Sequence, residues 1–253
     1  MALVTGAARG IGAATVKRLA QDGFHVIALD VVEDDPRLPY SLGTAGELFG
    51  LRSERVQPVA VDACDAELLG EVLDDFEVRW GGLDVVVAAA GVIAGGVPAW
   101  ELDVQQEQAV LDINLGGVLT AARVGVPAML KRPAPREGRF IAVASAASTR
   151  GLPNLAAYCA AKAGVVGFVR ALAVELGGTG VTANAVSPGS TRTKILEESA
   201  RLYEIEVEAF ADQQPLKRLL EPEEVAAMIG FLASAASRGA TGGNYPVDGG
   251  LAV

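Results

Sequence analysis

The chain has 253 residues, of which 51% are hydrophobic and 21% charged, and its net charge is −10. This length suits one α/β domain or two small ones, and the composition can fill a large core. The acidic balance works against binding to nucleic acids or to anionic membranes. Uninterrupted apolar runs such as Val85–Ala90 are far shorter than the roughly 20 residues of a membrane span.

Histidine, cysteine and the first residues bear on metal chemistry and compartment. His25 is the single histidine, which rules out histidine-cluster zinc sites, and we expect no metal site. Met1 leads directly into an apolar run, so we expect no signal peptide. Cys64 and Cys159 are then expected to be reduced thiols in a cytoplasmic protein.

Short apolar runs alternate with helical patterns along the chain. Near-continuous apolar runs are typical of parallel strands covered by helices on both faces. We expect strands at Ala2–Thr5, His25–Asp30, Val56–Asp62, Leu83–Ala90, Arg139–Ser145, Val181–Val186 and Asn244–Val247. We expect helices near Ile11–Asp22, Ala66–Trp80, Val104–Lys131, Ala156–Leu176 and Pro222–Ala233. This alternation predicts a single doubly wound, Rossmann-type α/β domain over residues 1–253, with a mostly parallel seven-stranded sheet.

Three connecting segments are irregular. Val32–Arg55 is long for a connection, and Lys131–Gly138 has the composition of an exposed loop. Ser187–Leu220 starts with Pro188-Gly189 and continues with a charged helical stretch, Lys194–Phe210. Long excursions of this kind are often lids or binding loops, so we expect a mobile substrate loop at residues 188–220.

A glycine-rich segment, Thr5-Gly6-Ala7-Ala8-Arg9-Gly10-Ile11-Gly12, joins the first strand to the first helix. Glycines let the backbone approach a pyrophosphate closely, and the helix N-terminus adds free N–H groups. A tight packing turn can have the same composition, and the spacing differs from the Gly-x-Gly-x-x-Gly of many dehydrogenases. Its place between a strand and a helix favours phosphate binding.

Asp30 ends the second expected strand, 18 residues after Gly12. A carboxylate at that point can accept hydrogen bonds from the adenosine ribose of NAD. The alternative is an acidic residue at a strand end on the surface.

Tyr158 and Lys162 are four residues apart in a helical segment and so share one face. A tyrosine with a pKa of about 10 is a poor base at neutral pH. A nearby ammonium group would lower that pKa and let Tyr158 exchange a proton with an alcohol or carbonyl oxygen. Taken alone, without the glycine-rich turn, this spacing favours an ordinary pair on a helix surface.

The whole chain resembles the short-chain dehydrogenases/reductases. The resemblance is carried by Thr5–Gly12, Asp62, Ala88–Gly91, Asn114, Ser145, Tyr158–Lys162, Asn184–Thr193 and Val247–Gly250. It implies that Tyr158 is the catalytic acid/base and that Ser145 hydrogen-bonds the substrate oxygen. It also implies that Lys162 holds the nicotinamide ribose and lowers the tyrosine pKa, and that Asn114 positions a proton-relay water.

The resemblance further implies an NAD site made from residues spread along the chain. Asp62 and Ala63 resemble the adenine contacts, and Pro188–Thr193 resembles the segment that fixes the nicotinamide carboxamide. The cofactor residues implied are Gly6, Arg9, Gly10, Ile11, Gly12, Asp30, Asp62, Ala63, Ala90, Gly91, Tyr158, Lys162, Pro188, Gly189, Thr191 and Thr193. The family commonly has Asn-Asn-Ala-Gly where this chain has Ala88-Ala89-Ala90-Gly91, so the support given by the first asparagine must come from elsewhere.

Two segments, Asp34–Tyr40 and Ser187–Thr193, resemble the mycofactocin-associated subgroup. That subgroup is thought to hold NAD tightly and to pass electrons to a peptide-derived redox carrier. The alternative is an ordinary family member with a surface insertion.

We therefore expect an NAD-dependent oxidoreductase that interconverts a small secondary alcohol and a carbonyl compound. One rival is a 3-oxoacyl-carrier-protein reductase, which Asp30 opposes because such enzymes generally use NADPH. Another is a non-catalytic NAD-binding sensor, which would not need Ser145, Tyr158 and Lys162 together. The resemblance also implies a homotetramer or homodimer, with close helix contacts allowed by Ala160, Ala161, Gly164 and Gly167.

Overall fold

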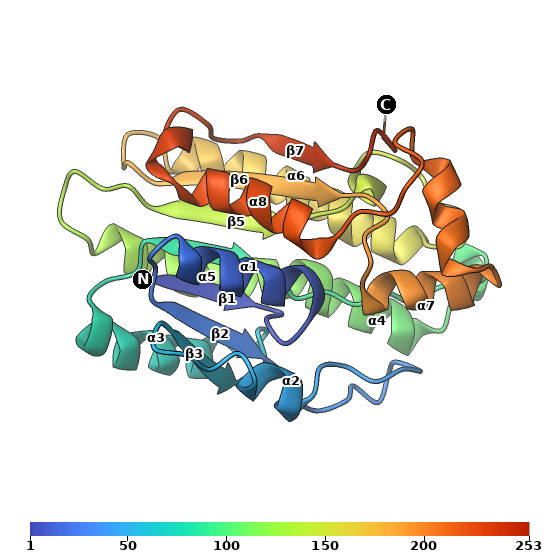
Figure 1. The fold of residues 1–253 in the computed structure, drawn as a ribbon, viewed down its shortest axis with the longest axis horizontal. Coiled ribbons are helices and arrows are strands. Elements are labelled where there is room, and N and C mark those ends of the chain that lie inside the picture. The colour runs from blue at the N-terminus through green and yellow to red at the C-terminus, as the bar shows by residue number, and fades with distance from the viewer. Residues whose placement is uncertain (253) are drawn as a thin grey trace.

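Seven parallel strands form one sheet, in the order β3-β2-β1-β4-β5-β6-β7 (Figure 1). The structure is a computed structural model that describes residues 1–252. The strands are β1 (Ala2–Thr5), β2 (Val26–Asp30), β3 (Val56–Ala60), β4 (Val85–Ala88), β5 (Arg139–Val143), β6 (Thr182–Pro188) and β7 (Asn244–Val247). The strand order reverses between β1 and β4, as in a doubly wound sheet. The predicted Rossmann-type fold is confirmed, and every strand pairing is parallel.

Helices cover both faces of the sheet. The core on one face includes α1 (Gly10–Gln21), α2 (Ala45–Phe49) and α8 (Pro222–Ala233). The core on the other includes α3 (Ala66–Trp80), α5 (Gly117–Leu130) and α6 (Ala156–Glu175), and α4 (Val104–Leu111) packs against α6. The remaining helix, α7 (Lys194–Tyr203), lies beyond the carboxyl ends of the strands (Figure 1).

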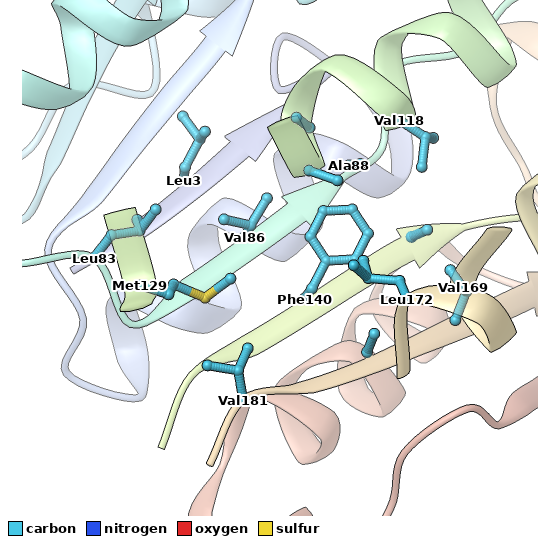
Figure 2. Close-up of a cluster of buried hydrophobic side chains, with 14 of the residues drawn as sticks. Leu3, Leu83, Val86, Ala88, Val118, Met129, Phe140, Val169, Leu172 and Val181 are labelled. Carbon is cyan, nitrogen blue, oxygen red and sulfur yellow. The ribbon is translucent and has the colours of Figure 1, made fainter. Parts of the chain in front are cut away.

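Alternate strand residues fill the two cores. Leu3, Val86 and Phe140 point toward α3, α5 and α6, and Figure 2 shows Phe140 at the centre of this cluster. Their neighbours Val4 and Val87 belong to the core beneath α1 and α8. Burial on both faces explains why the central strands β1, β2 and β4 are nearly continuous apolar runs rather than alternating ones.

Local capping signals set two helices at their predicted bounds. The Asp65 carboxylate accepts from the N–H groups of Glu67 and Leu68 at 3.0 Å, and α3 starts directly after it. Pro222 occupies the first turn of α8, behind a capping box formed by Glu221 and Glu224.

The predicted helix Val104–Lys131 is interrupted by a π-helical turn at Asp112–Gly116. The Asn114 amide donates to the carbonyl of Val110 at 2.8 Å, an acceptor that an uninterrupted helix would give to the backbone N–H of Asn114. Hydrophobic periodicity does not reveal such a break, and π-turns occur frequently at functional sites.

The predicted helical stretch Lys194–Phe210 is wrong beyond Tyr203. Glu204 has a left-handed backbone with φ of 53°, which ends α7, and Val207–Gln213 forms a separate 3-10 turn. In the connection Val32–Arg55, the short helix α2 was also not predicted; Thr44 and Glu47 cap it reciprocally.

Two helical stretches, Val104–Leu130 and Ala156–Glu175, are long and apolar enough to cross a membrane by length and composition alone. Both contribute buried side chains to the core beneath the sheet, including Val118, Met129 and Val169 (Figure 2). They are core helices, and their apolar character reflects packing against the strands.

Candidate active site

One cavity of about 1030 Å³ lies at the carboxyl ends of the strands. Its walls include Gly6 after β1, Asp30 at the end of β2, Asp62 after β3 and Val143 at the end of β5. Every predicted site residue lines it except Asn114, which is buried behind the wall. Open α/β sheets bind ligands at this edge, where the strand order reverses. The volume is at the upper end of typical ligand sites, with room for a dinucleotide.

The glycine-rich turn has a shape that only glycine allows. Gly6 has φ of 66°, and an added Cβ would lie 2.5 Å from the backbone nitrogen of Ala90. An added Cβ at Gly12 would lie 1.9 Å from the Gly6 carbonyl oxygen. The N-cap residue of α1, Arg9, makes no side-chain cap, so backbone N–H groups of the first turn remain for a ligand. This cradle fits the pyrophosphate of a dinucleotide.

The support expected from the missing asparagine comes from Thr5. Its hydroxyl accepts from the backbone N–H groups of Ala89 at 3.2 Å and Ala90 at 3.3 Å. These bonds tie the end of β1 to the segment after β4.

The carboxylate of Asp30 faces the glycine-rich turn and accepts from the N–H of Ala8 at 2.8 Å. Burial raises the pKa of Asp30, while the bond from Ala8 acts in the opposite direction. The guanidinium of Arg9 also lowers the pKa of Asp30, and it donates to the carbonyl oxygens of Leu42 at 3.0 Å and Ser41 at 3.1 Å.

Ser145, Tyr158 and Lys162 converge from β5 and α6. Ser145 follows the end of β5, its hydroxyl accepts from the N–H of Ala147 at 3.1 Å, and it lies near the Tyr158 hydroxyl. The Lys162 ammonium lies 5.8 Å from the centre of the Tyr158 ring and donates to the Val143 carbonyl at 2.9 Å. Both side chains are buried, with 8% of Tyr158 and 3% of Lys162 exposed.

Burial dominates the electrostatics of Tyr158 and Lys162. It raises the pKa of Tyr158, and the neighbouring Ser145 hydroxyl opposes that rise only in part. Burial also lowers the pKa of Lys162 to about 8. Desolvation prevails at Tyr158 and the ammonium is directed at Val143, so the lowering of the Tyr158 pKa by Lys162 stays a prediction.

Asn114 is fixed inside the π-turn next to the catalytic group. Its amide nitrogen donates to Val92 at 2.9 Å and Val110 at 2.8 Å, and its amide oxygen accepts from the N–H of Val92 at 3.3 Å. An added Cβ at Gly91 would lie 2.9 Å from that oxygen and 3.4 Å from the Lys162 nitrogen. Gly91 therefore lets Asn114 and Lys162 approach one another.

The segment Pro188–Thr193 also lines the cavity, and its end lies against the glycine-rich turn. An added Cβ at Gly10 would lie 3.1 Å from the methyl carbon of Thr193. The Thr191 hydroxyl donates to the Gly189 carbonyl at 3.0 Å, and the Thr193 hydroxyl donates to the Thr191 carbonyl at 3.2 Å. The remote motifs Gly6–Gly12 and Pro188–Thr193 thus meet at one site.

Residues 31–44 form a strap, and several of them also line the cavity. The sequence marked this connection as long but did not identify its residues as part of the site. Its Arg37 bonds to Asp112 of the π-turn at 2.8 Å, and its Tyr40 hydroxyl accepts from the N–H of Ile93 at 2.9 Å. Leu38 and Leu42 are buried. Apolar residues at 38, 40 and 42 in a polar loop were the available signal that this insertion packs on the molecule.

The wall around Tyr158 is mostly apolar. Tyr203 of α7 donates to the Pro153 carbonyl at 2.7 Å, which joins α7 to the loop before α6. The apolar lining residues that share a cluster with Tyr158 include Ile93, Ala147, Leu152, Leu155 and Ile195.

Comparisons with known proteins agree with this geometry. Residues 6–252 match the family described as Enoyl-(Acyl carrier protein) reductase. The chain is 38% identical over 250 residues to cis-4-hydroxycyclohexanecarboxylate dehydrogenase of Sinomonas cyclohexanicum, across 99% of this chain and 95% of the relative. The chain belongs to the short-chain dehydrogenase/reductase family.

Other members of the family are similarly close. The 3-oxoacyl-[acyl-carrier-protein] reductase of Thermotoga maritima is 36% identical over 251 residues, across 99% of this chain and 97% of that one. The crystal structure of carveol dehydrogenase from Mycobacterium avium in complex with NAD superposes with a TM-score of 0.92 at 32% identity, covering 99% of this chain and 96% of that one. This short-chain dehydrogenase/reductase is an NAD-dependent enzyme that acts on CH–OH or carbonyl groups.

Proposed function

We propose that the enzyme interconverts a secondary alcohol and its ketone, with Tyr158 as the acid/base. The observation that carries this proposal is that Ser145, Tyr158 and Lys162 line the same cavity as the glycine-rich turn. A proton-transfer group and a dinucleotide cradle sharing one water-restricted space are what hydride transfer at a carbon–oxygen bond requires.

The chain's own residues divide the work. NAD, when bound, supplies the hydride acceptor or donor. Gly6–Gly12 would hold its pyrophosphate, Asp30 its adenosine ribose, Asp62 and Ala63 its adenine, and Lys162 its nicotinamide ribose. Ser145 orients the substrate oxygen, and Tyr158 takes its proton during oxidation or returns it during reduction. Asn114, buried behind Gly91, would hold the water that links Lys162 to solvent.

The apolar wall supports a substrate with a bulky hydrocarbon part, such as a ring alcohol. Filling such a wall removes apolar surface of the ligand from water. The name of the Sinomonas relative, a hydroxycyclohexanecarboxylate dehydrogenase, is consistent with this class. A second candidate, reduction of a 3-oxoacyl group on a carrier protein, is favoured by the similarity to the Thermotoga enzyme. Asp30 and the net charge of −10 oppose that candidate.

The strap supports the narrower resemblance to the mycofactocin-associated subgroup. It is hydrogen-bonded to Asp112, Ile93 and Arg9, all of which line the cavity. A strap fixed in this way would slow the release of NAD, and bound NAD would then be re-oxidised in place by a mycofactocin-type redox carrier. The segment 194–220 would act as the mobile substrate loop.

A closed homodimer or homotetramer in the cytoplasm completes the proposal. On α6, Ala160 and Gly167 are exposed and available for contact with a second copy. Ala161 is fully buried, and an added Cβ at Gly164 would lie 3.1 Å from Leu115, so these two residues pack within the subunit.

A substrate panel tests the proposal directly. Purified protein with NAD and an artificial redox dye is given apolar ring alcohols and open-chain hydroxy acids, and with NADH or NADPH it is given a 3-oxoacyl thioester. We expect turnover of the ring alcohols with NAD. Preference for the thioester with NADPH would favour the carrier-protein reductase instead. Tight NAD binding without turnover of any compound would favour a sensor.

A further inference from the structure

We propose that Gln214 is a positioning residue that fixes the backbone at the nicotinamide end of the NAD site. Its side chain is fully buried, although it comes from the loop after the 3-10 turn Val207–Gln213. It does not line the cavity and touches the site only through Ser190 and Gly189. The inference rests on the proposed role of Pro188–Thr193 as the carboxamide segment.

The Gln214 amide spans two backbone segments. Its oxygen accepts from the N–H of Ser190 at 2.9 Å, and its nitrogen donates to the Arg218 carbonyl and, at 3.5 Å, to the Ser190 carbonyl. The approach is close: an added Cβ at Gly189 would lie 2.5 Å from the Gln214 amide oxygen. A buried amide with donors and acceptors satisfied in this way fixes the backbone it bonds to.

Fixing Ser190 also orients its neighbour Thr191, which forms an isolated parallel β-bridge with Leu220. The N–H of Leu220 donates to the Ser190 carbonyl at 2.9 Å, and the N–H of Arg192 donates to the Leu220 carbonyl at 2.9 Å. In a parallel bridge these bonds turn the N–H and C=O of the intervening residue, Thr191, to the opposite side. Thr191 lines the cavity, where its backbone can meet a carboxamide. Gln214 and Leu220 together set that orientation by holding Ser190.

Comparing two nucleotides separates this role from a general effect on folding. NADH carries the nicotinamide, whereas ADP-ribose has the same adenosine and pyrophosphate without it. Gln214→Met keeps the side-chain volume and removes the hydrogen bonds. We expect the dissociation constant of NADH to rise about tenfold, because the variant loses the two to three modest hydrogen bonds that fix the backbone next to the nicotinamide. The dissociation constant of ADP-ribose should change less than about twofold.

Asn184 supplies a matched control. Its amide nitrogen donates to the Ala240 carbonyl at 2.8 Å, and its amide oxygen accepts from the Gly243 N–H at 3.1 Å. Asn184 does not line the cavity. Asn184→Leu should lower thermal stability and leave the ratio of the two dissociation constants unchanged.

The measurement is calorimetric titration of charcoal-stripped protein with NADH and with ADP-ribose. A selective loss of NADH affinity in Gln214→Met supports the inference. Equal losses for both nucleotides, or an unchanged ratio, would overturn the role of Gln214 alone. If the wild-type protein binds NADH no more tightly than ADP-ribose, the proposed role of Pro188–Thr193 in binding the nicotinamide is wrong, and this inference falls with it.

Discussion

Single side chains determine the chemistry of this site through burial. Tyr158 and Lys162 are both withdrawn from water, and desolvation moves each pKa toward the neutral form of the group. Spacing along the helix predicted that the two residues are neighbours. It could not predict the direction of the Tyr158 pKa shift, because that depends on how deeply α6 is covered and on the competing Val143 carbonyl.

Lys162 should give the nucleotide-free protein a distinctive pH dependence. Its pKa is about 8 when folded, against an ordinary value of about 10.4 when unfolded. Between these values the unfolded chain binds more protons, so stability rises with pH. We expect the free energy of unfolding to rise from pH 8 to pH 10 by about 2 kcal/mol more in wild type than in Lys162→Met. Urea titrations that shift in parallel for both proteins would contradict this.

Asp30 should select NAD over NADP. The 2′-phosphate of NADP would place a like charge beside a carboxylate that is already partly desolvated. After screening, the penalty should amount to roughly 10²-fold in affinity. Arg9 offers little compensation, because its guanidinium is bound to Ser41 and Leu42.

The test compares dissociation constants of NAD and NADP for wild type, Asp30→Ser and the distant surface control Asp22→Ser. Asp30→Ser should narrow the gap between the two cofactors, and Asp22→Ser should preserve it. Equal wild-type affinities would show that another group sets cofactor choice.

At the scale of elements, the sheet and its helices followed from patterns along the chain, whereas the interruptions did not. Nearly continuous apolar runs marked most of the strands, and α3 and α8 start at the residues that the sequence predicted. The π-turn depends on one side chain, Asn114, taking a backbone acceptor. The strap depends on pairs far apart in sequence, such as Arg37 with Asp112, which local patterns cannot reveal.

The strap should control the release of NAD. Arg37→Gln removes the ion pair with Asp112. The Arg37 side chain is 31% exposed and that of Asp112 42%, so the effect on stability should be small. We expect bound NAD to dissociate several-fold faster from this variant. Arg52→Gln, an exposed arginine of the same connection outside the cavity, should match wild type. Wild-type protein that loses its NAD on brief dialysis would refute retention by the strap.

At the scale of the whole molecule, the cavity draws on residues from Gly6 to Leu251, so it forms only when the complete sheet is assembled. The outer face of α6 remains open in the single subunit. Gly167 is exposed there, and an added Cβ would meet nothing within 4 Å. A charge at this position is therefore tolerated by the monomer and opposed by an apolar contact between copies.

Light scattering should give a dimer or tetramer for wild type and a smaller species for Gly167→Glu. Gly70→Glu is the matched control, because an added Cβ on α3 also meets nothing within 4 Å. A wild-type monomer at micromolar concentration would refute the assembly.

The most direct measurement is the rate of NADH formation when NAD-loaded protein is mixed with a secondary alcohol that the wild type oxidises. The wild type is compared with Tyr158→Phe. Phenylalanine keeps the ring and removes the hydroxyl that transfers the proton. The rate should fall roughly 10²–10⁴-fold while NAD affinity is retained, and the distant Tyr245→Phe in β7 should behave as wild type. A Tyr158→Phe protein with a near wild-type rate would contradict the proposed chemistry.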